Sequence, residues 1–261
     1  MSRLNDLGIK FLVLLYSLLN GEINIKIFHI SKKEIDKEVS NIIINLVKVK
    51  PDCVLGLATG STPIGVYERL IEEYKSGNIS FNKVTTFNLD EYLNIEEDNY
   101  NSYKYFMRDK LFNHIDINLD NTFIPNSLVS DDKEAMMYDE LIEEKGGIDL
   151  QILGLGSDGH IGFNEPRTPF SSLTHIQELN EKTIIDNSRF FDNVEDVPTK
   201  AVTMGLKSIM NSRQIILIIY GENKKQALND FIYGDINESI PCSILKKHPN
   251  LLVYIDETLA Y

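Results

Sequence analysis

The residues most able to do chemistry lie in one short loop, from Asp158 to Pro166. This loop gathers two carboxylates, Asp158 and Glu165, and one imidazole, His160. Either carboxylate could accept the ring proton of His160 and fix its tautomer, which is an arrangement typical of acid–base catalysis. The alternative is an ordinary Gly-Asn turn with a surface histidine, because loops are rich in these residues. The other polar loops of the chain favour catalysis.

A second loop has the character of an anion site. It joins an apolar run to a stretch with helical spacing and consists of Thr59, Gly60, Ser61 and Thr62. Free amide groups, hydroxyls and the positive end of a helix dipole would converge there, as they do in phosphate sites. The loop lacks the residues of a Walker or a dinucleotide-binding motif, so no nucleotide is implied. A simple helix cap by Ser61 or Thr62 is the alternative.

Two more carboxylates, Asp90 and Glu91, follow the apolar run at 84–89. Adjacent carboxylates in a concave, partly dry site raise each other's pKa, which makes a carboxylate a useful base near neutral pH. Either residue could instead be a helix cap or a solvated acid, and for Glu91 we favour that role. The residues alone leave the role of Asp90 open between a base, a helix cap and a solvated acid.

A phosphate site also needs positive charge, and two residues stand where they could supply it. Lys224 follows the apolar run at 214–220, and Arg189 belongs to a polar segment after the Asp158 loop. Guanidinium and ammonium groups form strong, charge-assisted hydrogen bonds to phosphate oxygens. Taken alone, each would be interpreted as a solvated surface residue.

Alternating strands and helices would bring these loops to one edge of a sheet. Apolar runs predict strands at 23–28, 53–58, 84–89, 150–156, 214–220 and 251–255. Helical spacing predicts helices at 32–49, 66–74, 133–145 and 224–232. This alternation predicts an α/β fold, a doubly wound, mostly parallel sheet with helices on both faces in a Rossmann-like three-layer sandwich. Such sheets bind ligands at the carboxyl ends of their strands.

The chain is expected to form one domain. Its 261 residues can bury a substantial core, and no linker, repeat or low-complexity tract divides them. We expect a single domain over 23–261, preceded by an N-terminal extension at 1–22 of uncertain role. The polar stretch at about 167–199 shows little periodicity and is predicted to be a lid over the site.

Composition excludes several classes of partner. The formal net charge is −13 and no Lys/Arg cluster is visible, so nucleic acid and anionic membrane surfaces are not expected to bind. No apolar run is long enough to span a membrane. The run at 11–19 resembles a signal peptide but lacks a small-residue cleavage site, so we expect a cytoplasmic protein.

Cysteine and histidine usage points to a protein without a metal. Cys53 and Cys242 are far apart and belong to no ligand motif, which predicts two buried thiols in a reducing compartment. One histidine between two acids, His160, gives no spacing typical of zinc. No metal is expected.

Together, these motifs resemble those of the glucosamine-6-phosphate deaminase family. The resemblance covers about 23–257 and rests on four segments in order, at 57–63, 86–92, 154–166 and 187–191. It implies a hydrolase acting on a C–N bond, which isomerises and deaminates glucosamine 6-phosphate to fructose 6-phosphate and ammonia. It further implies a place in amino-sugar catabolism and N-acetylglucosamine utilisation.

The resemblance also implies a role for each candidate residue. Asp90 would move a proton from C2 to C1 of the sugar, and His160 would open the pyranose ring. Asp158 and Glu165 would orient and charge the imidazole of His160. The phosphate would rest on Thr59, Gly60, Ser61 and Thr62 and be closed in by Arg189 and Lys224. Such chemistry needs no metal or organic cofactor, only acid–base catalysis and positioning.

Some positions depart from the family pattern, and two other functions remain open. Allosteric members carry several basic residues after the catalytic loop, whereas 168–178 contains only His175, so we expect no activation by an N-acetylated effector. The oligomeric state stays undecided. A 6-phosphogluconolactonase would share the fold but needs no carboxylate that carries a proton between C1 and C2. A non-catalytic sugar-phosphate sensor would bind the sugar without turnover.

Overall fold

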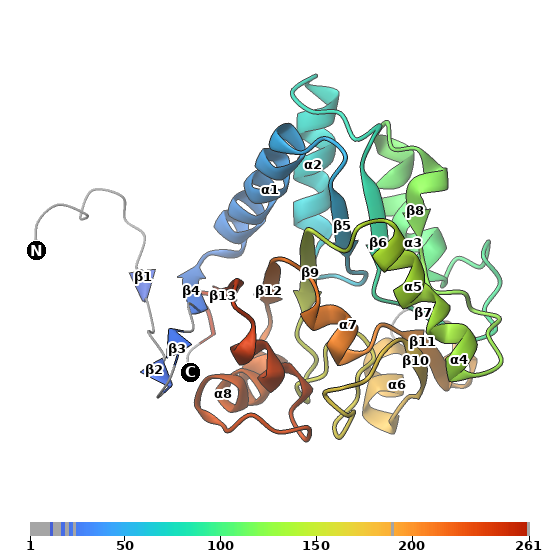
Figure 1. Ribbon diagram of the computed structural model, residues 1–261. Coiled ribbons are helices and arrows are strands. Elements are labelled where there is room, and N and C mark those ends of the chain that lie inside the picture. Colours follow the sequence, from blue (N-terminus) through green and yellow to red (C-terminus); the bar gives the residue numbers. More distant parts are fainter. Residues whose placement is uncertain (1–10, 13–16, 19–20, 23–24, 189–190, 260–261) are drawn as a thin grey trace, which may run out of the picture.

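A computed structural model describes residues 11–12, 17–18, 21–22, 25–188 and 191–259, with an eight-stranded sheet at the centre (Figure 1). The strand order is β1-β4-β13-β12-β9-β5-β6-β8. The strands are β1 (Phe11–Leu12), β4 (Ile25–Ile30), β5 (Val54–Leu57), β6 (Thr85–Asn88), β8 (Thr122–Phe123), β9 (Leu150–Gly154), β12 (Ile215–Ile219) and β13 (Leu251–Asp256). All neighbours pair in parallel except β1 and β4. The predicted, mostly parallel sheet is confirmed.

Helices cover both faces of this sheet. The apolar side chains of α1 (Lys32–Val49), α2 (Ile64–Lys75) and α3 (Tyr103–Lys110) pack into one core cluster. Those of α5 (Met137–Glu144), α7 (Leu206–Met210) and α8 (Lys225–Tyr233) pack into the other. The central strand β12 contributes Ile216 and Ile218 to the first cluster and Ile215, Leu217 and Ile219 to the second. Because successive side chains of a strand point to opposite faces, a strand buried on both faces is apolar throughout.

Helix α1 has the bounds that its periodicity predicts, and its start has a clear cause. Ser31 accepts a hydrogen bond from the backbone N–H of Glu34, and the Glu34 carboxylate accepts one from the backbone N–H of Ser31. This reciprocal capping box satisfies two amide groups that the helix itself leaves unpaired. Buried Ile35, Val39 and Ile43 form the face that packs on the sheet.

A small antiparallel sheet lies beside the large one and was not predicted. It consists of β10 (His175–Glu178), β11 (Lys200–Thr203) and β7 (Asp90–Tyr92), in that order. Strand β7 follows β6 after a single residue, so the chain passes directly from the large sheet to the small one. The small sheet therefore joins a segment of the predicted lid to the residues around Asp90.

Two other predictions differ from the structure in detail. The helix predicted at 133–145 is two helices, α4 (Asp132–Ala135) and α5, which meet at Met136. The predicted lid at about 167–199 contains regular structure, namely β10, α6 (Glu181–Ser188) and the 3-10 turn η3 (Val194–Asp196). The remaining short elements are β2 (Ser17–Leu18), β3 (Gly21–Glu22), η1 (Phe112–His114), η2 (Leu119–Asn121), η4 (Glu222–Lys224) and η5 (Pro241–Lys247).

The helices in the described part of the chain are too short or too polar to cross a membrane.

Candidate active site

A cavity of about 630 Å³ lies at the carboxyl edge of the large sheet, where the candidate loops meet. Its lining includes Thr59, Gly60, Ser61, Thr62, Asp90, His160 and Lys224. These residues follow β5, β6, β9 and β12, four strands that are far apart in sequence and neighbours in the sheet. The expectation that parallel strands bring these loops together is therefore met.

The loop after β5 keeps the start of α2 open. Pro63 occupies the N-cap position, and no side chain caps the helix there. The alternative interpretation of Ser61 or Thr62 as a simple cap is therefore wrong. Gly60 has φ of 79°, a left-handed conformation that favours glycine and turns the chain into the helix. Uncapped amide N–H groups at a helix start can donate hydrogen bonds to an anion.

Asp90 is the first residue of β7 and is almost fully buried, with 7% of its surface exposed. Burial, and then the nearby charge of Glu91, raise the pKa of the Asp90 carboxyl to about 8. Gly162 lies against it, because a Cβ on Gly162 would stand 3.3 Å from Oδ2 of Asp90 and 3.0 Å from Oγ1 of Thr203. A carboxyl with this pKa can accept and return a proton near neutral pH.

Glu91 does not face the cavity but caps α3. Its carboxylate accepts hydrogen bonds from the backbone N–H groups of Tyr92, Tyr103 and Lys104, at 2.9, 2.9 and 3.0 Å. Burial raises the pKa of Glu91, while these three amide donors lower it. The interpretation of Glu91 as a cap is confirmed, and Asp90 and Glu91 thus have different roles.

His160 and Asp158 form a close pair. Nδ1 of His160 lies 2.7 Å from Oδ1 of Asp158, and the same oxygen accepts the backbone N–H of His160 at 3.2 Å. Burial acts to raise the pKa of Asp158, but hydrogen bonds and attraction from His160 lower it well below its usual range. Gly156 makes room for the ring, because a Cβ there would stand 2.4 Å from it. Of the two open partners for His160, the structure selects Asp158.

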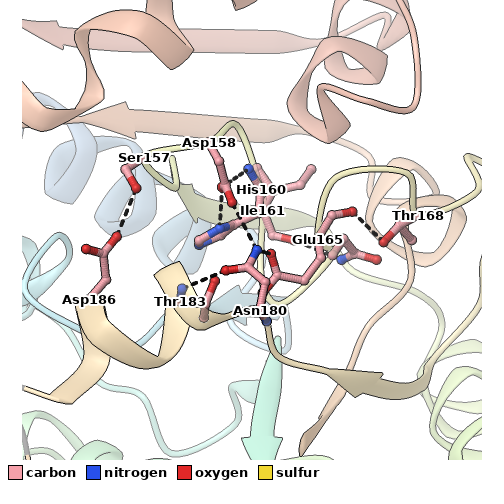
Figure 2. Close-up of polar contacts among 10 residues, drawn as sticks. Ser157, Asp158, His160, Ile161, Glu165, Thr168, Asn180, Thr183 and Asp186 are labelled. Carbon is pink, nitrogen blue, oxygen red and sulfur yellow. Dashed lines mark hydrogen bonds and ion pairs between the residues drawn. The ribbon is translucent and has the colours of Figure 1, made fainter. Parts of the chain in front are cut away.

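Glu165 lies behind this pair rather than in the cavity lining. The ligand atoms of Glu165, Asp158 and His160 are all within 4.8 Å of one another (Figure 2). Burial raises the pKa of Glu165, against the opposing effects of Thr183, His160 and the backbone N–H of Asn180. Glu165 can therefore act on His160 through charge at short range.

The same three residues are of types that can hold a metal ion. All three already have other partners, since Asp158 engages Nδ1 of His160 and Asn180 donates to Glu165. The absence of a metal from the working protein stays a prediction.

Of the two predicted cations, the structure describes Lys224 but not Arg189. Lys224 ends the 3-10 turn η4 after β12 and lines the cavity, as predicted. Gly221, with φ of 92°, lets the chain turn sharply between the strand and Lys224. Arg189 lies outside the described residues, so its predicted contact with phosphate is untested.

Comparison with known proteins decides the family. The sequence model of the family described as glucosamine-6-phosphate isomerases/6-phosphogluconolactonase matches residues 31–253. The chain belongs to this family. The resemblance seen in the motifs is thereby confirmed.

Within the family, the similar proteins of higher identity are deaminases. The glucosamine-6-phosphate deaminase of Clostridium tetani is 53% identical over 219 residues, which are 84% of this chain and 91% of that protein. A monomeric glucosamine-6-phosphate deaminase of known structure is 42% identical, with a TM-score of 0.86 over 90% of this chain and 99% of the other. A 6-phosphogluconolactonase from Thermotoga maritima is 20% identical, with a TM-score of 0.70 over 89% of this chain and 98% of the other. That last likeness shows the fold alone.

Sequence reasoning missed the aromatic wall of the cavity. Tyr92, Tyr103 and Phe163 line it, and their rings pack together, with centroids 5.0 Å apart for Tyr92 and Tyr103 and 6.0 Å for Tyr103 and Phe163. Tyr103 opens α3, whose N-cap Ser102 accepts the backbone N–H of Tyr105. A serine before a run of aromatic residues was the available signal for this helix.

Proposed function

We propose that this chain is a glucosamine-6-phosphate deaminase that converts glucosamine 6-phosphate and water to fructose 6-phosphate and ammonia. The observation that carries the proposal is the buried Asp90 at the cavity, with its pKa raised to about 8. Isomerisation needs a base that takes a proton from C2 and returns it to C1, whereas hydrolysis of a lactone does not. The similarity to deaminases supports the same choice.

The site supports an order of steps. His160, polarised by Asp158, moves a proton to the ring oxygen and opens the pyranose to an aldehyde. Asp90 then takes the C2 proton and delivers it to C1, while a proton of the amino group passes to the C1 oxygen, which gives a C1 alcohol with an imine at C2. Water adds to C2 and ammonia leaves, so the oxygen of the new ketone comes from water. Asp90 ends the cycle in the protonation state in which it began.

The phosphate gives the substrate its anchor. We place it on the loop Thr59, Gly60, Ser61 and Thr62, where the uncapped start of α2 presents amide donors. Lys224 lines the same cavity and supplies one positive charge, and we assign a second to Arg189. Local positive charge of this kind lets a protein of net charge −13 bind a small anion.

The remaining properties follow from composition and chemistry. The reaction needs no metal or organic cofactor, since the carbonyl formed on ring opening already acidifies the C2 proton. We infer a cytoplasmic hydrolase of amino-sugar catabolism that acts on a sugar phosphate and binds no nucleic acid. The segment at about 167–199 is proposed to act as a lid, and residues 1–22 as an extension of the catalytic domain.

The experiment that tests the proposal measures both products. Purified protein in EDTA is given glucosamine 6-phosphate, and ammonia and fructose 6-phosphate are assayed separately. Equal release of both supports the deaminase, and indifference to added N-acetylglucosamine 6-phosphate supports a form without allosteric activation. Parallel samples receive 6-phosphogluconolactone, and hydrolysis of that compound alone would replace this proposal with the lactonase. Binding of glucosamine 6-phosphate without turnover would replace it with a sensor.

A further inference from the structure

Asn180 lies between the two carboxylates near His160, and no sequence motif points to it. Its side-chain Nδ2 donates to Oε2 of Glu165 and to Oδ2 of Asp158, the second at 3.3 Å (Figure 2). Its backbone N–H donates to the other oxygen of Glu165, at 3.3 Å. One residue therefore bridges both carboxylates.

The bridge answers a physical difficulty at this site. Glu165 is buried, and Asp158 is a carboxylate a few ångströms from it, so their negative charges repel at close range. An amide offers two N–H donors, carries no charge and does not titrate. Asn180 can thus hold both carboxylates in place at every working pH, which a lysine or histidine bridge would not do.

The other end of the same side chain caps a helix. Oδ1 of Asn180 accepts the backbone N–H of Thr183 at 2.8 Å, in the first turn of α6. A second contact joins α6 to the loop, because Ser157 donates to Asp186 at 2.9 Å (Figure 2). The catalytic loop and α6 are therefore joined at both the start and the middle of the helix.

The backbone before Asn180 is connected to the strand that carries Asp90. Leu179 donates its N–H to Thr199 at 2.8 Å, continuing the pairing of β10 with β11. Strand β11 pairs in turn with β7, where Thr203 stands opposite Asp90. The small antiparallel sheet thus links Asn180 to the candidate base.

We propose that Asn180 is a positioning residue that holds Asp158 and Glu165 against His160 and fixes the start of α6 to them. The effect of Asn180 on turnover rests on the proposed function, whereas the effect of Asn180 on the two carboxylates does not. It is not a catalytic residue, because Asn180 does not line the cavity.

The substitution Asn180→Asp separates the bridge from the cap. It keeps an oxygen for the N–H of Thr183, since aspartate and asparagine cap helices about equally well. It replaces the side-chain amide donors with a third carboxylate, beside those of Asp158 and Glu165. The titratable groups packed around this cluster are Asp158 and His160 on the loop, Asp186 on α6, and Cys242 of η5, whose backbone N–H donates to Gly159.

The first measurement is the titration of the Glu165 carboxyl by ¹³C NMR in ligand-free protein, assigned with Glu165→Gln. In N180D, loss of the donors and the new like charge should raise its midpoint by about one pH unit. The second measurement is steady-state kinetics, in which kcat at neutral pH should fall by about tenfold while KM changes little.

The matched control is Asn118→Asp, which makes the same change at an exposed cap of η2, where Oδ1 of Asn118 accepts the N–H of Asp120. It should leave the Glu165 titration and the kinetics unchanged. A Glu165 midpoint in N180D within about 0.2 pH units of the wild-type value would overturn the inference. If the wild type itself lacks turnover, the proposed function fails, and the carboxyl titration still decides the role of Asn180.

Discussion

Asp90 is held in a protonation state that an exposed aspartate does not adopt near neutral pH. Substitution by asparagine keeps the shape and removes the proton carrier, so kcat for deamination should fall by about 1,000-fold or more. Binding should persist, because the phosphate loop does not include Asp90. Ligand-induced thermal stabilisation, measured beside turnover, checks both parts. Loss of binding together with turnover would assign Asp90 a structural role.

The same burial makes the free energy of unfolding depend on pH through Asp90. Its pKa rises from an ordinary 3.8 to about 8 on folding, so between these values the folded state keeps a proton that the unfolded chain has lost. The stability contributed by that proton is complete below pH 3.8 and is lost as the pH rises towards 8.

Asp90→Asn does not titrate, so its stability advantage over the wild type should grow across this window and then level off. The growth should be at most about 1.4 kcal/mol per pH unit. Urea unfolding of both proteins at pH 5, 7 and 9 measures it, and Asp52→Asn, at an exposed position, is the control with a constant difference. A difference independent of pH for D90N would mean that the Asp90 carboxyl is not desolvated as the structure has it.

Lys224 offers a test of the phosphate site. Lys224→Ala should raise KM for glucosamine 6-phosphate by about tenfold or more, with a smaller effect on kcat, because phosphate binding is shared by ground and transition states. Lys225→Ala is the matched control, since Lys225 is exposed and is not part of the cavity lining. An unchanged KM in K224A would remove Lys224 from the phosphate site.

Single residues differed in how readily the sequence revealed them. Asp90, His160 and Lys224 each follow an apolar run that could only be a strand, so their place at one edge could be predicted. Asn180 follows β10, whose residues are half-exposed or exposed and carry no strong pattern, so nothing in the sequence placed it beside Asp158. A side chain that acts through contacts across the fold leaves no local spacing to detect.

At the scale of elements, α3 depends on a carboxylate from another segment. Glu91 satisfies two backbone amides in the first turn of α3 as well as that of Tyr92. Glu91→Ala should lower the free energy of unfolding by about 2 kcal/mol, because buried amide donors lose their acceptor. It should also raise KM, since Tyr103 and Tyr105 of α3 line the cavity.

Chemical denaturation and steady-state kinetics of the same preparation measure both effects. Glu34→Ala is the control, because Glu34 caps α1, which does not line the cavity. It should lower stability and leave KM unchanged. An E91A protein with wild-type stability would mean that the cap contributes little to α3.

The elements that could not be predicted share a physical cause. Strands β7, β10 and β11 have three or four residues each, and they pair antiparallel between segments far apart in the chain. Short strands give too few alternations for a periodic signal, and their pairing depends on the large sheet already being formed. The large sheet could be predicted because β12 is a continuous apolar run and β9 is apolar apart from Gln151, and both strands are buried.

At the scale of the molecule, the apolar cores and the candidate active site occupy different parts of the fold. The two apolar cores lie on the faces of the large sheet, and the cavity lies at its carboxyl edge. Ion pairs of Asp149 with Lys50 and Arg213 stand before β9, at the opposite end of that strand from His160. A rigid sheet can thereby hold charged groups at fixed distances while the loops at one edge vary.

The place of residues 1–22 in this arrangement leads to a final prediction. The described residues that line the cavity begin at Ala58, and the match to the family begins at residue 31. Strand β1 pairs antiparallel with β4 at the edge of the large sheet, with Phe11 opposite Phe28. Removal of residues 1–22 should therefore leave kcat and KM within about twofold of the full-length values.

The same truncation should make the protein associate more readily, because it uncovers the backbone hydrogen-bonding groups of β4. Kinetics, circular dichroism and light scattering of residues 23–261 beside the full chain measure these effects. A truncated protein that keeps its helix content but loses turnover would place the N-terminal segment in the active site. Unchanged turnover with larger particles would instead identify that segment as a cover for the sheet edge, outside the catalytic domain.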